Sequence, residues 1–582
     1  MRGRSSDLLV FSLSTFIGCA ALGCAKPSET KATGTSASSS EVPGDSGGSA
    51  VPASKRIAPL LDGMGDHHHE ITTKVPEAQK YFDQGLTLGW GFNHAEAERS
   101  FREAARLDPE CAMCFWGAAW VLGPNINAKM DKADIPRAWE ALQKASALKS
   151  NASEKEQAYI TALEKRYAAQ PPDDRAPLDK AFAEAMREVV KKYPDDLDAR
   201  ALLGEALMDL HPWDYWNLKN GKAQPWTGEI LKTLEGVMAK DETHPGANHL
   251  YIHALEASPA NAKKAEGAAD RLGTLVPGAG HLVHMPAHIY LRVGRYADAS
   301  AANEAAIKAD QAYITQCRSQ GIYPLAYHPH NYHFLWATAT FEGRSAKAID
   351  AAKKVAGKVP PDKLGDHCWG TLQHYHSTPL YAYTRFGKWD EILAAPQPDP
   401  KLVYPMAVWR YARGMAHVGK GQLDQAETEL EALKKHCWGD ANKKELTKVT
   451  IWDINNTSAL MEIAIKVLAG ELAAKKGDHK TAIKELEGAL DMETKLNYDE
   501  PPDWYYPVRH SLGAVYLEAK KPKQAERVYR DDLKWWPENG FSLFGLREAL
   551  TAQGKTKQAA AVDARLQKAW ANADMKLSSS RF

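Results

Sequence analysis

The stretch GHLVHMPAHIYLRVGRYADA, residues 280–299, combines the two patterns that decide how this chain is interpreted. Its second half contains a glycine, Gly294, and an alanine five residues later, Ala299. A glycine readily ends a helix and permits a turn, and a small alanine lets the next helix pack closely on the first. Its first half contains three histidines at helical spacing. The stretch therefore predicts two helices joined by a turn, with a strip of imidazoles on one of them.

The glycine element recurs along most of the chain. Further copies begin at Gly343, Gly387, Gly421, Gly477 and Gly554. Ala265 and Ala299 lie 34 residues apart, and so do Ala525 and Ala559. A helix–turn–helix unit with a period of 34 residues is that of the tetratricopeptide repeat. From about Pro76 to Asp574 the chain resembles this superfamily.

The resemblance implies an all-α fold, a right-handed superhelical solenoid of about ten helix pairs. Apolar residues three or four apart in Ala-, Leu-, Glu- and Lys-rich segments agree with helices, and no alternating strand pattern of useful length occurs. We expect an N-terminal repeat-like region over 58–240, histidine-rich repeats over 241–395 and C-terminal repeats over 396–582. YFDQGLTLGWGFNHAEAERSF (81–101) and EPPDWYYPVRHSLGA (500–514) also resemble a group of bacterial tetratricopeptide lipoproteins.

Residues 1–24 have the features of an export signal. Arg2 and Arg4 precede an apolar run from Leu8 to Gly23, and the run ends in ALGC at Cys24. This ending resembles the lipobox of bacterial lipoproteins, which implies cleavage and lipidation at Cys24; the alternative is a plain secretory signal. Because Ala25 follows the cysteine, we expect the protein on the periplasmic side of the outer membrane, or secreted.

Residues 25–57 are rich in Ser, Gly and Pro and have almost no large apolar side chain, so we expect a disordered linker. The 582 residues include 73 Lys and Arg and 73 Asp and Glu. This neutral balance gives no reason to expect nucleic acid as a partner. We expect contact with a membrane through the lipid anchor only.

Histidines are concentrated in three neighbouring repeats. They are His249, His253, His281, His284, His288, His330 and His333. Within each repeat they lie three, four or seven residues apart, which places them on one helical face. The resemblance implies that they occupy the repeat positions that face the concave groove.

Imidazole is the commonest protein metal ligand, and clusters on packed helices build metal sites. The seven histidines could therefore hold one or two transition-metal ions, each with three ligands and an open position. All-imidazole ligation suits copper, which we favour, and zinc or iron are alternatives. Further candidate ligands are Glu256, His374, His67 and His68. Tyr251, Tyr290 and Tyr332 are candidates for supporting roles.

Two classes of function compete. The first is a metal-binding lipoprotein, which an open coordination position would allow to act as an oxidoreductase or hydrolase. The second is a non-catalytic scaffold that binds a peptide or protein partner in the groove, as arrays of this kind commonly do. Neither a P-loop nor a dinucleotide fingerprint nor a nucleophile elbow occurs in the sequence. Cys111 and Cys114 share one helical face, where we expect buried thiols.

Overall fold

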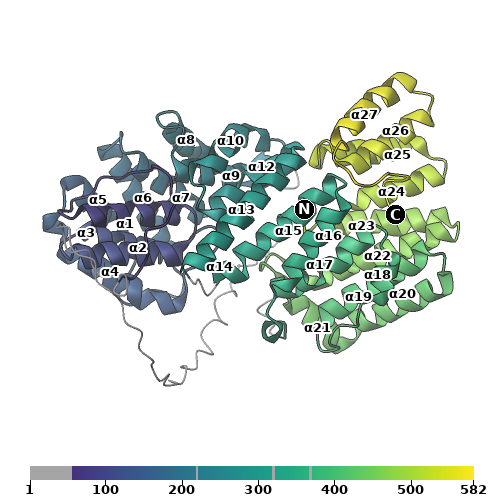
Figure 1. Cartoon of the computed structure of the whole chain (residues 1–582), viewed down its shortest axis with the longest axis horizontal. Helices are drawn as coiled ribbons and strands as arrows, with labels where there is room; N and C mark the ends of the chain where they lie inside the picture. The colour runs from purple at the N-terminus through teal and green to yellow at the C-terminus, as the bar shows by residue number, and fades with distance from the viewer. Residues whose placement is uncertain (1–55, 218–220, 318–321, 366–369) are drawn as a thin grey trace, which may run out of the picture.

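The computed structural model describes residues 56–217, 221–317, 322–365 and 370–582 (Figure 1). The export signal over 1–24, the lipidation site Cys24 and nearly all of the predicted linker lie outside the described residues. In the part of the chain that is described, no helix combines the length and the apolar character needed to cross a membrane.

The described chain is helical almost throughout. The helices of the first half are α1 (Pro76–Trp90), α2 (His94–Leu107), α3 (Ala112–Trp120), α4 (Ile135–Ala147), α5 (Glu154–Leu163), α6 (Ala176–Lys192), α7 (Leu197–Asp209), α8 (Thr227–Met238), α9 (Pro245–Glu256), α10 (Glu266–Leu275), α11 (Gly280–His284), α12 (Pro286–Val293) and α13 (Tyr296–Cys317). Those of the second half are α14 (Ile322–Leu325), α15 (Tyr327–Phe341), α16 (Ser345–Gly357), α17 (Gly370–Arg385), α18 (Trp389–Ala394), α19 (Val403–Gly419), α20 (Leu423–Trp438), α21 (Asp440–Lys448), α22 (Thr457–Lys475), α23 (His479–Glu493), α24 (Val508–Glu518), α25 (Pro522–Trp535), α26 (Gly540–Thr551) and α27 (Thr556–Ala569).

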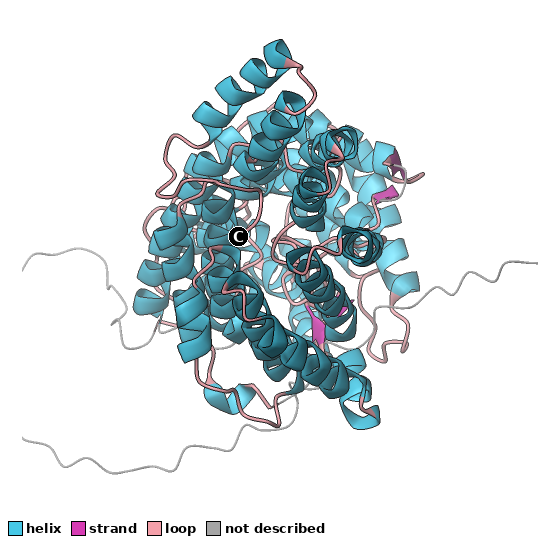
Figure 2. Cartoon of the chain, turned by 90° about the vertical axis from the view of Figure 1, so that its right-hand side faces the viewer, coloured by secondary structure: helices cyan, strands magenta, loops and turns pink. Residues whose placement is uncertain are grey.

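Two very short hairpins are the only sheets among the described residues (Figure 2). β1 (Trp216–Asn217) pairs with β2 (Lys222–Ala223), and β3 (Thr450–Ile451) pairs with β4 (Asn455–Asn456), both antiparallel.

Consecutive helices pack as pairs, and successive pairs stack along the long axis of the molecule (Figure 1). The pairs are α1–α2, α3–α4, α5–α6, α7–α8, α9–α10, α11 and α12 with α13, α15–α16, α17–α18, α19–α20, α22–α23, α24–α25 and α26–α27. The predicted all-α, tetratricopeptide-like solenoid is thus confirmed, with slightly more pairs than the expected ten or so.

The turns between paired helices form as the glycine pattern predicts. All six repeat glycines have a positive φ, as in Gly294 (φ 82°), which ends α12 in the left-handed conformation. Helix starts are also set locally. The Ser153 side chain accepts from the Glu156 backbone N–H while the Glu156 carboxylate accepts from the Ser153 N–H, which begins α5.

The hydrophobic core of the described residues consists of two large clusters that meet near α13 and a small third one around Ile392, Ala412 and Ala416. The first runs from Ala58 to Ala299 and the second from Ile307 to Leu566, although Phe334, Phe341 and Trp536 of the second half pack on the first cluster. The histidine-rich helices lie beside this junction, so both halves of the solenoid contribute to their surroundings.

The C-terminal repeats fold back onto the middle of the chain. The Asp574 carboxylate accepts from the backbone N–H groups of Ser345 (2.8 Å) and Ala346 (2.9 Å) at the start of α16. The Tyr296 hydroxyl donates to the Pro537 carbonyl over 2.7 Å. Glu500, in the segment between α23 and α24, is paired with His288 and Arg292 of α12, so this segment also packs on the middle of the chain.

Cys111 and Cys114 form a disulfide at the start of α3, so the expectation of two buried thiols is wrong. Three residues along a helix bring two cysteine side chains onto one face, which is also the geometry that permits a bond. Cys437 is a free, buried thiol.

Candidate metal centre

Four helices, one of them very short, bring six histidines together. His249 and His253 lie on α9, His281 and His284 on α11, His288 on α12 and His330 on α15. We call these six residues the groove cluster.

Pro286 shapes this part of the chain. A proline lacks the N–H that would continue the helix and crowds the carbonyl four residues earlier, so α11 ends and α12 begins here. His281 and His284 consequently lie on a short helix that precedes the helix of His288. The ring of His284 still lies close to the rings of both His281 and His288.

The first triad consists of His249, His253 and His281. One candidate ligand atom from each lies within 4.8 Å of the other two. The Nε2 atoms of all three rings are buried and have no hydrogen-bond partner among the described residues. The opposite nitrogen of His249 donates to the Trp90 carbonyl over 2.6 Å, and that of His253 lies 3.0 Å from the Glu256 carboxylate. Such bonds on the outer nitrogen fix ring orientation in metal sites.

The second triad consists of His284, His288 and His330, whose candidate ligand atoms also lie within 4.8 Å of one another. Two of the outer nitrogens are bonded: His284 Nδ1 to Asn303 Oδ1 (2.7 Å) and His288 Nδ1 to Glu500 Oε2 (2.8 Å). His330 Nδ1 is buried and has no partner among the described residues. The Nε2 atoms of His284 and His288 face each other at 2.9 Å.

Buried carboxylates lie behind the rings. Glu256 Oε1 contacts His253 Nδ1 at 3.0 Å, and Glu256 Oε2 contacts His288 Nδ1 at 3.2 Å. Glu500 contacts His288 and is also paired with the buried guanidinium of Arg292. Burial raises the pKa of Glu500 to about 7 although Arg292 opposes the shift, and burial with the neighbouring Glu500 raises that of Glu256 well above its ordinary value.

The imidazoles of the groove cluster are neutral at pH 7. Burial lowers the pKa of His249 to about 3 and that of His284 to about 4. Burial and the other histidines hold the pKa of His253, His281, His288 and His330 well below the ordinary value. Neutral imidazole is the form that ligates metals.

An aromatic ring covers each triad. Phe92 lies 4.6 Å from His249, 5.7 Å from His253 and 5.8 Å from His281 between ring centroids. Phe334 lies 5.0 Å from His284 and 4.7 Å from His288. Apolar rings packed on buried imidazoles lower the local dielectric constant.

His333 and His374 lie apart from both triads. Their ring centroids are 5.2 Å apart, and His374 Nδ1 is bonded to the Tyr404 hydroxyl over 2.8 Å. Both nitrogens of His333 are buried without a partner among the described residues. The structure therefore brings together six of the seven predicted ligands and pairs His333 with His374.

The remaining candidates have other partners. The Glu256 carboxylate contacts the Nδ1 atoms of His253 and His288. Glu256, His288 and Glu500 also form a third group whose candidate ligand atoms lie within 4.8 Å of one another. The expected supporting tyrosines are not bonded to the cluster: the hydroxyls of Tyr251, Tyr290 and Tyr332 are bonded to Glu235, Asp270 and Gln311.

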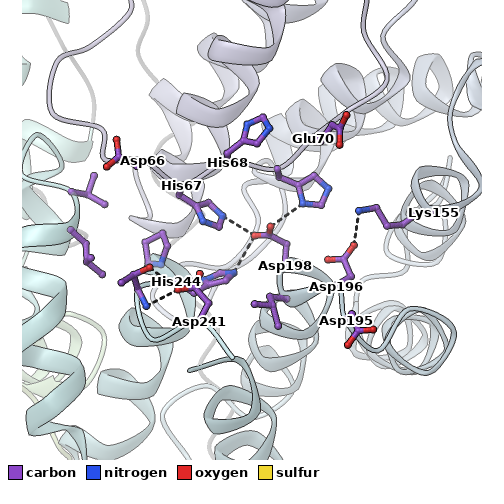
Figure 3. Close-up of a pocket in the computed structure, with 16 residues that line it drawn as sticks. Asp66, His67, His68, Glu70, Lys155, Asp195, Asp196, Asp198, Asp241 and His244 are labelled. Atoms are coloured by element: carbon purple, nitrogen blue, oxygen red, sulfur yellow. Dashed lines mark hydrogen bonds and ion pairs between the residues drawn. The ribbon is translucent and has the colours of Figure 1, made fainter. Parts of the chain in front are cut away.

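His67 belongs to a second group, in which three imidazoles surround Asp198 (Figure 3). His67 Nε2 (3.0 Å), His69 Nδ1 (2.9 Å) and His244 Nε2 (3.2 Å) contact its carboxylate. We call these four residues the N-terminal cluster. They line a cavity of about 590 Å³. His68 points away, 57% exposed, and its ring contacts Asp83.

The Asp198 carboxylate and the imidazoles around it stabilise one another electrostatically. Burial alone would raise the pKa of Asp198, but the His67 charge and hydrogen bonds from His244, His67 and His69 hold it well below the ordinary value. Burial lowers the pKa of His67 and His69, yet Asp198 outweighs it, so both are raised. His244 Nδ1 also accepts from the Ala247 N–H (3.2 Å), which begins α9.

Sequence reasoning missed three residues of the centre, Phe92, Asn303 and Glu500. Phe92 and Glu500 lie in the two stretches that resemble bacterial lipoproteins, 81–101 and 500–514. The resemblance of those stretches was therefore a signal that could have pointed to both residues. The sequence around Asn303 resembles an ordinary helix surface and contains no signal for a role in the site.

Comparison with known proteins gives a likeness of fold only. No family model and no curated protein matches the chain. Among solved structures, the APC/C hetero-tetramer Cut9-Hcn1 is 15% identical over 84% of this chain and 76% of its own, with a TM-score of 0.29. The human IFIT1 dimer with m7Gppp-AAAA is 13% identical over 86% and 91%, with a TM-score of 0.30. Naa15/Naa10 bound to HypK-THB is 12% identical over 86% and 90%, with a TM-score of 0.22. Likenesses this distant carry no argument about ligand or activity.

Proposed function

We propose that this protein binds transition metal through the groove cluster. The observation that carries the proposal is the set of three buried Nε2 atoms in His249, His253 and His281, which have no partner among the described residues. A buried polar atom without a hydrogen bond costs roughly 1–3 kcal/mol. A bound cation would satisfy all three at once.

The surroundings favour a soft or borderline metal over calcium or magnesium. Imidazole nitrogens suit copper, zinc and iron, whereas calcium and magnesium prefer oxygen ligands. We favour copper, with zinc or iron as alternatives. Three imidazoles leave a coordination position open, so oxidoreductase or hydrolase chemistry is compatible with the centre.

The alternative, a scaffold that holds a peptide through imidazole hydrogen bonds, fits the described side chains less well. His249, His253 and His284 are essentially inaccessible, and Phe92, Phe334 and the segment around Glu500 cover the rings. A helical-repeat solenoid still offers extended surfaces to protein partners elsewhere.

Metal analysis of the purified protein tests the proposal. After incubation with copper and with zinc, followed by removal of loose metal, we expect at least one equivalent of metal per chain by elemental analysis. His249→Gln combined with His253→Gln should abolish retention at the first triad, while Tyr251→Phe on the same helix should not. A wild-type chain that stays metal-free would leave the scaffold as the better proposal.

We also infer export and lipidation at Cys24, which rest on the apolar run and ALGC. Replacement of Cys24 by serine should move the protein from the membrane fraction to the soluble fraction. An unchanged distribution would contradict this inference.

A further inference from the structure

We propose that the groove cluster is a dinuclear centre, with one ion in each triad and with Glu256 shared between the two. This inference rests on the proposed metal binding and adds the number of ions and the residue that connects them.

The second triad has the geometry of a separate ion site. Asn303 donates its amide N–H to the Ala299 carbonyl (2.8 Å), so its oxygen faces His284 Nδ1 as an acceptor. His284 therefore has its proton on Nδ1 and a lone pair on Nε2.

The same argument applies to His288. Its Nδ1 faces the Glu500 carboxylate at 2.8 Å, and Glu500 is paired with Arg292. With Nδ1 as the donor, His288 also directs an Nε2 lone pair inward. The two lone pairs would then face each other across 2.9 Å. In the square-planar or tetragonal geometry typical of Cu(II), two nitrogens about 2 Å from one ion and about 90° apart are separated by ~2.9 Å. An ion bound by both removes the repulsion.

The two triads are too close to be independent. The ring centroids of His281 and His284, which belong to different triads, are 6.1 Å apart, and those of His253 and His288 are 6.4 Å apart. Two ions held by these rings would be neighbours among buried side chains, where charges are screened weakly.

Glu256 is the only described carboxylate that contacts both triads. Its Oε1 lies 3.0 Å from His253 Nδ1, and its Oε2 lies 3.2 Å from His288 Nδ1. A carboxylate on the outer nitrogen of a ligating imidazole orients the ring and strengthens it as a ligand. Glu256 is therefore a positioning residue for both ions. Glu500 contacts only one of the six rings, His288, and is the matched control.

Metal titration of the full chain distinguishes these roles. With Cu(II) and separately with Zn(II), we expect two ions per wild-type chain and one per chain in His284→Gln combined with His330→Gln. Glu256→Gln should weaken both binding steps by about 10- to 100-fold, because loss of such a supporting carboxylate typically has that effect. Glu500→Gln should weaken only one step. Circular dichroism of each metal-free variant checks that it is folded.

Each outcome decides a separate question. No metal on the wild type would remove the proposed function itself. One ion per wild-type chain would overturn the dinuclear centre while metal binding stands. Two ions with a Glu256→Gln effect on a single step, or on neither, would overturn the shared carboxylate.

Discussion

The molecule contains two clusters of buried histidines, and the carboxylates occupy opposite positions in them. In the N-terminal cluster, three rings surround one carboxylate, Asp198, whose two oxygens contact a nitrogen of each ring. In the groove cluster, ring nitrogens gather in two sets of three, and the carboxylates contact other nitrogens of these rings. In the first arrangement the carboxylate lies among the rings, although the Nε2 atom of His69 has no hydrogen-bond partner among the described residues. We propose that a cation lies between the rings of the second, so the position of the carboxylate distinguishes the two clusters more than the number of histidines does.

Removal of metal should have the largest effect on stability, and it should act through the groove cluster alone. Stripping the metal-loaded protein with a chelator should destabilise it by about 4 kcal/mol for each ion that had been present at roughly 1,000 times its dissociation constant. Calorimetric melting with and without chelator measures this. The loss should persist in Asp198→Asn, because that residue lies in the other cluster. Identical melting curves with and without chelator would contradict the comparison.

Replacement of Asp198 by asparagine should have the next largest effect. Removal of one partner from a buried ion pair leaves the other charge uncompensated and typically costs about 3–5 kcal/mol. Urea denaturation should show that loss, while elemental analysis should show an unchanged metal content. Loss of metal together with stability would mean that the two clusters act as one.

The clusters should respond to pH with opposite signs in the metal-free protein. Groove histidines have lowered pKa values, so the unfolded chain takes up protons first below about pH 6.5, and stability falls as the pH falls. For His284, whose folded pKa is about 4, the loss amounts to about 3 kcal/mol on reaching that pH. His67 and His69 have raised values, so their stabilisation is complete below about pH 6.5 and is lost as the pH rises through the folded pKa.

Urea denaturation across pH checks these signs. Asp198→Asn should flatten the decline on the alkaline side and leave the acid decline in place. The reverse pattern would show that the assignment of the two signs to the two clusters is wrong.

The smallest effect is expected at His68. Its ring is 57% exposed and contacts Asp83 at the surface, and such pairs contribute about 0–1 kcal/mol. His68→Ala should therefore leave metal content unchanged and shift the free energy of unfolding by less than about 1 kcal/mol. A loss of metal in this variant would extend the metal site to the whole DHHHE segment.

The helical solenoid was predictable because its signals are local. Gly294 and Ala299 act within one turn, and the same pattern recurs at a fixed period, so pairing and turn geometry follow from neighbouring residues. The six ligand candidates were predictable for the same reason, since spacing on a helix fixes the shared face. Their division into two triads was not, because it depends on the break at Pro286 and on how neighbouring repeats pack.

The surroundings of the cluster were beyond sequence reasoning for a different reason. Glu500 lies 212 residues from His288 along the chain, and no periodicity relates them. His333 fits the repeat pattern as well as His330 does, yet its ring contacts His374 rather than the second triad. Helical spacing predicts which side chains share a face but not which of them meet residues from another repeat.

The contact between Glu500 and His288 has a consequence for the order of folding. Repeat proteins can fold unit by unit from either end, because most contacts join neighbouring units. Here the contact between Glu500 and His288 requires a loop that follows α23. This contact can therefore form only after a segment from near the end of the chain has folded. Closure over such a long separation is slow compared with helix formation. A chain truncated after α23 should therefore build most of the solenoid and yet leave His288 without the Glu500 carboxylate, with Glu256 as its remaining acidic neighbour.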